Sequence, residues 1–169
     1  MAISFLRCDD RIIHGQVVTR WAMERECDGI IAVNDNAAND QLIRQALKAS
    51  SDKKTFVWTL EQFLIKMEEA TNSGKNYFVI TKEPLTMCKL LVDHNMKTKV
   101  SILNVGPQSA KEDTLKVGKN CDVTKEDIRV YDKIFSKGYE IEYQIVPDAT
   151  KVKYSAVREK LLAYANEEV

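Results

Sequence analysis

The chain has 169 residues, of which 44% are hydrophobic and 30% are charged, which excludes an intrinsically disordered chain. Lysine plus arginine and aspartate plus glutamate number 25 each, so the formal net charge is zero. This balance argues against a general attraction to nucleic acid, and we expect no nucleic-acid partner. The length predicts one domain over residues 1–169.

The sequence contains no recognisable targeting signal, membrane span or metal motif. Charged residues begin at Arg7, too early for a signal peptide, and no apolar run approaches the ~20 residues of a membrane helix. The cysteines form no C-x-x-C pair and have no histidine close by, so we expect reduced, mostly buried thiols and no metal site. These features predict a cytoplasmic protein. The four cysteines are Cys8, Cys27, Cys88 and Cys121.

Strand and helix patterns alternate along the first part of the chain. Residues 3–8 predict a strand, and residues 15–26 predict a helix with one apolar face. The continuous apolar run 29–33 is typical of a strand buried on both faces. The pair Asn39-Asp40 then offers a cap for a helix over residues 42–47.

The alternation continues through the middle of the chain. Residues 55–58 predict a strand, and residues 59–62 open the next helix with a capping box. A strand is expected over 77–81, and a helix with proline in its first turn over 84–91. Residues 100–105 predict a further strand, which ends at a Gly-Pro turn.

The last part of the chain begins irregularly. Residues 107–120 are polar and lack periodicity, and they form the least regular stretch of the chain. A helix capped by Thr124 is closed by Gly138, and a strand over 139–146 and a helix over 154–165 follow. The whole pattern predicts the α/β fold class, a single domain with an open, mostly parallel twisted sheet and helices on both faces. Ligands of such sheets bind beyond the carboxyl ends of the strands.

The densest polar cluster follows the first predicted strand. His14 stands just before the predicted helix start, where unpaired backbone N–H groups and the helix dipole favour an anion. Arg11 adds a planar fork suited to phosphate oxygens, and a neutral imidazole can act as a nucleophile. The cluster therefore suits a phosphoryl group carried on His14. Its members are Arg7, Asp9, Asp10, Arg11, His14, Gly15, Gln16, Thr19 and Arg20.

Other interpretations of these residues stay open. His14 could cap or pack the helix without doing chemistry. Asp9 and Asp10 could form an acid/base pair, but their arginine neighbours favour a role in orienting Arg11 or His14. A metal held by these side chains lacks further ligands. No G-x-G-x-x-G or Walker motif occurs, so no nucleotide cofactor is expected, and His94 fits a structural role at a helix end.

The segment Arg7–Trp21, which reads RCDDRIIHGQVVTRW, closely resembles the signature of one family. It is that of the mannose/fructose/sorbose-family enzyme IIB components of the bacterial phosphoenolpyruvate-dependent sugar phosphotransferase system. The likeness spans nearly the whole chain, although Gly106-Pro107 stands where the family often has two glycines. It continues through residues 30–35, 103–106, 126–128 and 138–147.

The resemblance implies a phosphotransferase with a phosphohistidine intermediate and no cofactor. Such a IIB component accepts a phosphoryl group from its IIA partner and passes it to a sugar imported through the membrane subunits IIC and IID. It would therefore be cytoplasmic and peripherally associated with a membrane transporter. By matching positions, His14 would carry the phosphoryl group, with Nδ1 as the expected atom. Arg11 would bind the phosphate, and Asp10 would orient one of the two.

The neighbours of His14 are assigned to phosphate or partner binding. They are Arg7, Asp9, Gly15, Gln16 and Arg20, and we expect Arg7, Arg11, Gln16 and Arg20 to be exposed. Two other function classes remain as alternatives. A histidine acid/base enzyme would turn over a small molecule without a protein partner. A non-catalytic partner-binding module would not need His14.

Overall fold

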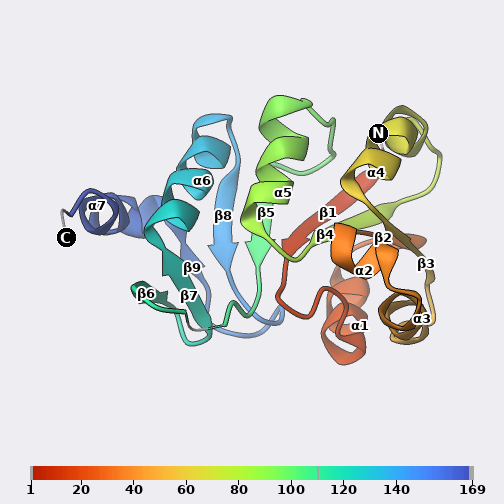
Figure 1. Ribbon diagram of the computed structural model, residues 1–169, viewed down its shortest axis with the longest axis horizontal. Coiled ribbons are helices and arrows are strands. Elements are labelled where there is room, and N and C mark those ends of the chain that lie inside the picture. Colours follow the sequence, from red (N-terminus) through yellow and green to blue (C-terminus); the bar gives the residue numbers. More distant parts are fainter. Residues whose placement is uncertain (1, 110, 168–169) are drawn as a thin grey trace.

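A mostly parallel sheet runs through the middle of the molecule (Figure 1). The computed structural model describes residues 2–109 and 111–167, so residues 1, 110 and 168–169 of the expected domain lie outside the described residues. The described strands follow the order β3-β2-β4-β1-β5-β8-β9, and β9 is antiparallel to β8 while the other neighbours are parallel. This confirms the predicted fold class. The strands are β1 (Ile3–Cys8), β2 (Gly29–Val33), β3 (Lys54–Trp58), β4 (Tyr77–Thr81), β5 (Ile102–Val105), β8 (Glu140–Tyr143) and β9 (Val152–Lys153).

Helices cover both faces of the sheet, as the alternating pattern predicted (Figure 1). On one face lie α1 (Gly15–Glu24), α2 (Asp35–Asn39) and α3 (Gln41–Ala49). On the other lie α4 (Leu60–Thr71), α5 (Pro84–Cys88) with the π-helix η1 (Lys89–Asp93), and α6 (Lys125–Ser136). The last helix, α7 (Tyr154–Ala165), packs beside α6 at the β9 end of the sheet.

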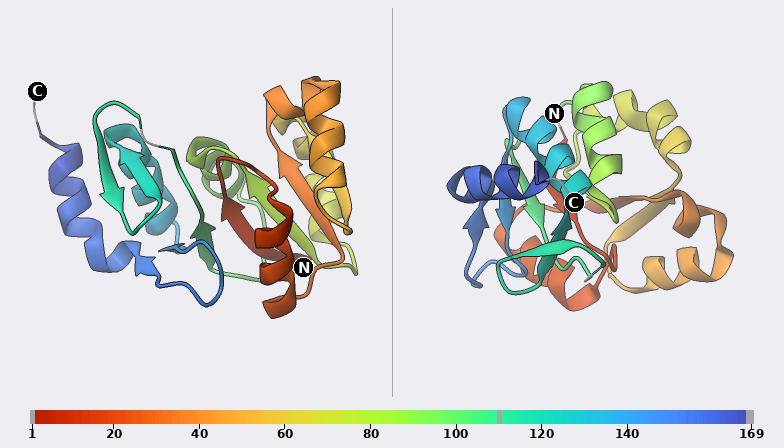
Figure 2. Two further views of the ribbon diagram at one scale, coloured as in Figure 1. Left: turned by 90° about the horizontal axis from the view of Figure 1, so that it is seen from below. Right: turned by 60° about the vertical axis from the view of Figure 1, so that its left-hand side comes forward.

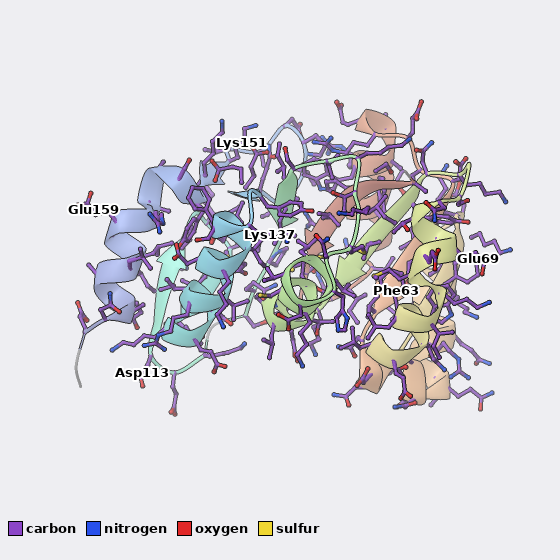
Figure 3. The ribbon with its side chains drawn as sticks, turned by 90° about the horizontal axis from the view of Figure 1, so that it is seen from above. Phe63, Glu69, Asp113, Lys137, Lys151 and Glu159 are labelled. Atoms are coloured by element: carbon purple, nitrogen blue, oxygen red, sulfur yellow. The ribbon has the colours of Figure 1, made fainter. Side chains whose placement is uncertain are left out.

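Each face of the sheet has its own hydrophobic cluster. On the α1 side, Trp21 stacks on Phe5 with ring centroids 4.9 Å apart. On the other side, α4 buries Phe63 completely, whereas its Glu69 side chain is 79% exposed (Figure 3). Alternate residues of β2 belong to the two clusters, which is why this strand needs a continuous apolar run.

Capping residues fix several helix starts. Thr59 and Thr124 each form a capping box with the residue three positions later. The capping box at Thr59 was predicted as such, and at Thr124 a capped helix start was predicted. Asp40 caps α3 as expected. Asn34 caps the five-residue α2, which was not predicted because so short a helix shows no periodicity. The helix predicted over 84–91 is α5 continued by η1.

The irregular stretch 107–120 contains a short strand that the sequence did not predict. Within this stretch β6 (Thr114–Val117) pairs antiparallel with β7 (Cys121–Thr124) as a hairpin outside the main sheet (Figure 2). Gln108 also bonds to the chain at the start of β7. Its backbone N–H donates to the Asn120 carbonyl at 3.0 Å, and its carbonyl accepts the Asp122 N–H at 3.2 Å. The conformation of such a short strand outside the main sheet is decided by its pairing partner, which the local sequence does not show.

The strand order reverses at the carboxyl ends of β1 and β5, where a crevice is lined by residues of the loops that follow β1, β4 and β5. The chain leaves β1 through α1 toward β2 and β3, and it leaves β5 in the opposite direction toward β8. Ligands of open α/β sheets bind at such a reversal of strand order, because the two loops diverge there. The loop that follows β1 and contains His14 borders this crevice.

Candidate functional site

His14 occupies the N-cap position of α1. Its backbone is extended, with φ −113° and ψ 113°, and its carbonyl accepts the Val18 N–H at 2.9 Å. The side chain makes no capping hydrogen bond, and its Nδ1 is buried without a hydrogen-bond partner among the described residues. A half-buried imidazole therefore stands beside the unpaired N–H groups of the first helical turn, which favour an anion.

Gly15 lets two helix ends approach each other. A Cβ at this position would overlap the carbonyl oxygen of Ser50, the residue that ends α3. Glycine is needed here because backbone meets backbone. Packing against the end of α3 therefore requires glycine at position 15, whether or not Gly15 also binds phosphate or a partner. The sequence did not reveal this requirement.

Arg11 is exposed on the loop between β1 and His14. Its backbone N–H donates to Oδ1 of Asp9 at 2.9 Å, and the N–H of Ile12 donates to the Asp9 carbonyl, also at 2.9 Å. These two bonds close a tight turn. Ile12 has a φ of 60°, which is unfavourable for a β-branched residue, and its side chain is only 6% exposed. The turn holds strained backbone two residues before His14.

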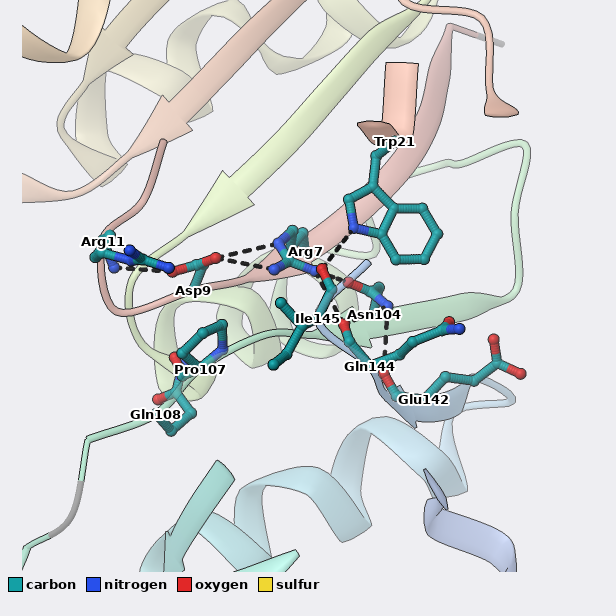
Figure 4. A network of polar contacts seen from close by, with 10 residues as sticks. All are labelled: Arg7, Asp9, Arg11, Trp21, Asn104, Pro107, Gln108, Glu142, Gln144 and Ile145. Carbon is teal, nitrogen blue, oxygen red and sulfur yellow. Dashed lines mark hydrogen bonds and ion pairs between the residues drawn. The ribbon is translucent and has the colours of Figure 1, made fainter. Parts of the chain in front are cut away.

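The expected exposure of Arg7 was wrong. Arg7 and Asp9 are each only 1% exposed, with Nη2 of Arg7 2.9 Å and Nε 3.3 Å from Oδ2 of Asp9 (Figure 4). Burial lowers the pKa of Arg7, and the carboxylate of Asp9 opposes this effect. Neither side chain can reach a partner's surface, because both lie beneath the loop where their charges are paired. Their assignment to phosphate or partner contact is therefore corrected to an internal ion pair.

Asp10 connects the two loops that border the crevice. Its backbone N–H donates to the Pro107 carbonyl at 3.1 Å, and its Oδ2 accepts the backbone N–H of Ser109. No hydrogen bond joins Asp10 to Arg11 or His14 within the described residues. The bond to the Arg11 backbone comes from Asp9, and the expected orienting role of Asp10 stays a prediction.

The remaining predicted residues lie along α1. Gln16 and Arg20 are exposed as expected, and Arg20 forms an ion pair with Asp148 of the loop after β8. An open groove of about 860 Å³ lies beside them, lined by residues of α1 and of the 49–52 segment. A second groove of about 620 Å³ lies on the Arg11 side of the loop. His94 is exposed at the end of η1, near the amino ends of the strands and so away from the crevice.

Sequence reasoning missed Asn104 and Gln144. The Arg7 guanidinium donates through Nη1 to Oδ1 of Asn104 and, at 3.2 Å, to the Gln144 carbonyl (Figure 4). Asn104 is 2% exposed and comes from β5, 97 positions further along the chain than Arg7. The signal in the sequence that could have indicated Asn104 is its position as a polar residue within the otherwise apolar strand β5.

The cysteines are free thiols, three buried and Cys27 partly so, in agreement with the expected burial. Within residues 2–109 and 111–167, no three His, Cys, Asp or Glu side chains gather as a metal site would require. None of the helices in the described residues combines the length and apolarity needed to cross a bilayer.

Solved structures place the fold in a recognised class. The chain is similar to the IIBSor domain of the sorbose permease from Klebsiella pneumoniae, with a TM-score of 0.79 and 22% identity, covering 100% of this chain and 99% of that one. It is also similar to manxB from Thermoanaerobacter tengcongensis, with a TM-score of 0.80 and 24% identity, covering 92% and 94%. These likenesses establish the fold.

Sequence relatives narrow the class to a family. The chain is 26% identical to the fructose-specific EIIB component of Bacillus subtilis, over 87% of this chain and 90% of that protein. It is 28% identical to the mannose-specific EIIAB component of Escherichia coli, over 90% of this chain but 47% of that longer protein. The family model described as the sorbose subfamily IIB component of the phosphotransferase system matches residues 3–168. The chain belongs to this family, as the resemblance implied.

Proposed function

We propose that this chain is the phosphoryl carrier of a sugar phosphotransferase system and that His14 carries the phosphoryl group. The observation that supports this most directly is the position of His14. His14 is the N-cap residue of α1, and its half-buried imidazole stands beside the unpaired N–H groups of the first helical turn, three residues after the exposed Arg11. A transferring phosphoryl group needs positioning and charge stabilisation, and both are available at this point.

The proposed cycle has two transfers. In the first, the P–N bond of a phosphohistidine on IIA breaks as a P–N bond to His14 forms. In the second, this bond breaks while a P–O bond forms to a sugar hydroxyl, and the hydroxyl proton passes to the departing imidazole of His14. The guanidinium of Arg11 would hold the equatorial oxygens through its fork, and the first-turn N–H groups of α1 would face the same charge.

The ring orientation decides how the transfer can occur. The resemblance implies Nδ1 as the phosphorylated atom, whereas Nδ1 is buried in the structure. Transfer at Nδ1 therefore requires a rearrangement of the side chain that exposes this atom. Nitrogen-15 and phosphorus-31 NMR of the phosphorylated protein identifies the bonded nitrogen.

The proposed partners are a IIA protein or domain, the membrane subunits IIC and IID, and the imported sugar. The relative named as an EIIAB component supports a IIA donor, since this chain aligns with about half of that protein. The proposed location is the cytoplasm, at the surface of the membrane transporter.

Phosphorylation with purified general phosphotransferase proteins, a cognate IIA and labelled phosphoenolpyruvate tests the proposal. We expect acid-labile label on the wild type and on the control His94→Ala, and none on His14→Ala. Arg11→Lys keeps the charge but loses the fork, and should slow single-turnover transfer by about 1–3 kcal/mol of barrier. Label that persists in His14→Ala would refute the assignment.

A further inference from the structure

We propose that Asn104 is a positioning residue for phosphoryl transfer, acting on the backbone of Arg11 through the buried pair Arg7 and Asp9. This inference rests on the proposed function, because it assigns Arg11 and His14 to the transfer. Asn104 itself touches neither of them among the described residues. Its effect must therefore be transmitted through the contacts between β5 and β1.

Three consecutive steps, made by four hydrogen bonds, connect Asn104 to the loop (Figure 4). Oδ1 of Asn104 accepts from Nη1 of Arg7, and the same guanidinium donates through Nη2 and Nε to Oδ2 of Asp9 at 2.9 and 3.3 Å. The second oxygen of Asp9, Oδ1, accepts the Arg11 N–H at 2.9 Å. The two carboxylate oxygens of Asp9 therefore bind different groups: Oδ2 binds the Arg7 guanidinium, and Oδ1 binds the backbone of the loop.

Asn104 is itself fixed from the opposite side. Its Nδ2 lies 3.4 Å from the carbonyl oxygens of Glu142 and of Gln144, at the end of β8. The amide therefore presents its oxygen to Arg7 and its nitrogen to β8, which defines its orientation. A side chain locked in this way can set the position of a guanidinium that is 1% exposed.

Close packing leaves Arg7 little freedom. A Cβ on Gly106 would overlap the guanidinium and would lie 2.9 Å from Oδ2 of Asp9, so the backbone after β5 closes over the ion pair. A buried guanidinium that lost the Asn104 acceptor would shift toward its remaining partners, since an unsatisfied buried donor is costly. Any shift moves Asp9, and with it the turn that contains Ile12 at φ 60°.

The strained turn at Ile12 makes the position of Arg11 sensitive to the loss of its bond to Asp9. A β-branched residue in the left-handed region is held there only by its surroundings. When the bond from Arg11 to Asp9 weakens, the turn can relax toward ordinary backbone geometry. The guanidinium of Arg11 and the imidazole of His14 would then lose their relative placement, and small misplacements of reacting groups cost large factors in rate.

The test compares three variants with the wild type. Asn104→Leu removes the acceptor at nearly constant volume, and Asn104→Asp restores an oxygen acceptor. Ser4→Ala is the control, because it removes a 2.7 Å hydrogen bond to the Glu26 carbonyl near the amino end of β1. Transfer from phosphorylated IIA is measured in single turnovers at several IIA concentrations, and amide hydrogen exchange is followed at Arg11 by NMR.

We expect Asn104→Leu to lower the saturating transfer rate about ten-fold or more, with the half-saturating IIA concentration unchanged within about two-fold. The Arg11 amide should lose protection from exchange. Asn104→Asp should recover the rate and the protection only in part, because it keeps an acceptor for Arg7 but turns its second oxygen toward the carbonyls of Glu142 and Gln144. Ser4→Ala should match the wild type in both. A role confined to stability would change the unfolding midpoint but not the rate of the folded protein.

Unchanged Arg11 protection and an unchanged rate in folded Asn104→Leu would overturn this inference. If that variant does not fold, Asn104→Ser, whose hydroxyl is too short to replace the amide, is measured with the same expectations. Absence of label on the wild-type His14 would instead refute the proposed function. The exchange measurement does not depend on phosphorylation, so the two failures are distinguishable.

Discussion

The substitution Gly15→Ala distinguishes the effect of helix propensity from that of tertiary packing. The two predict opposite changes in the free energy of unfolding. Alanine is the better helix former, by up to about 1 kcal/mol in a helix interior, and Gly15 is the first residue of α1. The local argument therefore predicts a stabilised protein. The structure predicts the reverse, since the new Cβ would overlap the Ser50 carbonyl oxygen.

The magnitude follows from what must move. The Ser50 carbonyl carbon would lie 3.4 Å from the added atom, so the obstacle is backbone at the end of α3 and not a flexible side chain. Overpacking of this kind costs about 1–3 kcal/mol, against which the propensity gain is small. We expect a net loss of about 1–2 kcal/mol in the free energy of unfolding. For a chain of this length the melting temperature should fall by roughly 2–8 °C.

Urea unfolding followed by circular dichroism measures this loss. Gly74→Ala is the matched control, because a Cβ at this exposed glycine would have no neighbour within 4 Å. That control should be neutral or more stable by about 0.4–1 kcal/mol. A Gly15→Ala variant as stable as the wild type would show that α1 and α3 do not approach as closely as described, and would refute the reasoning.

Three further predictions concern strain, thiol burial and acid stability. In urea unfolding, the loss in free energy of unfolding should be about 1–3 kcal/mol smaller for Ile12→Gly than for Ile13→Gly. Both side chains are buried, but of the two only Ile12 has a positive φ, so equal losses would contradict backbone strain at Ile12. Burial raises the pKa of Cys8 to about 12, so this thiol should resist alkylation near pH ~8 until the protein unfolds, as mass spectrometry of the labelled protein can show. The hydrogen bond from Arg158 lowers the pKa of Asp132 below 3.8, so its contribution to stability is present above that value and is lost as the pH falls through the lower pKa of the folded state. Asp132→Asn should therefore lose less stability than the wild type between about pH 5 and pH 2, and an identical loss would contradict this assignment.

The sequence by itself determined the order of the main strands and helices along the chain. Continuous apolar runs such as Gly29–Val33 and capping boxes such as that of Thr59 are local signals, so they predict local structure without knowledge of the fold. The strand-to-helix loop with Arg11 and His14 was recognisable for the same reason. Its likeness to a IIB family could be read from a continuous segment, because residues close in sequence stay close in space.

Tertiary structure alone decided which polar residues around His14 are buried. Arg7 and Asp9 read as surface charges in the sequence, but Asn104 and the Gln144 carbonyl enclose the guanidinium from 97 and 137 positions away. The requirement for glycine at position 15 likewise depends on the end of a different helix. The hairpin formed by β6 and β7 was missed because strand pairing, not the composition of four residues, fixes its backbone. Burial and pairing depend on distant segments, and no local pattern in a single sequence contains them.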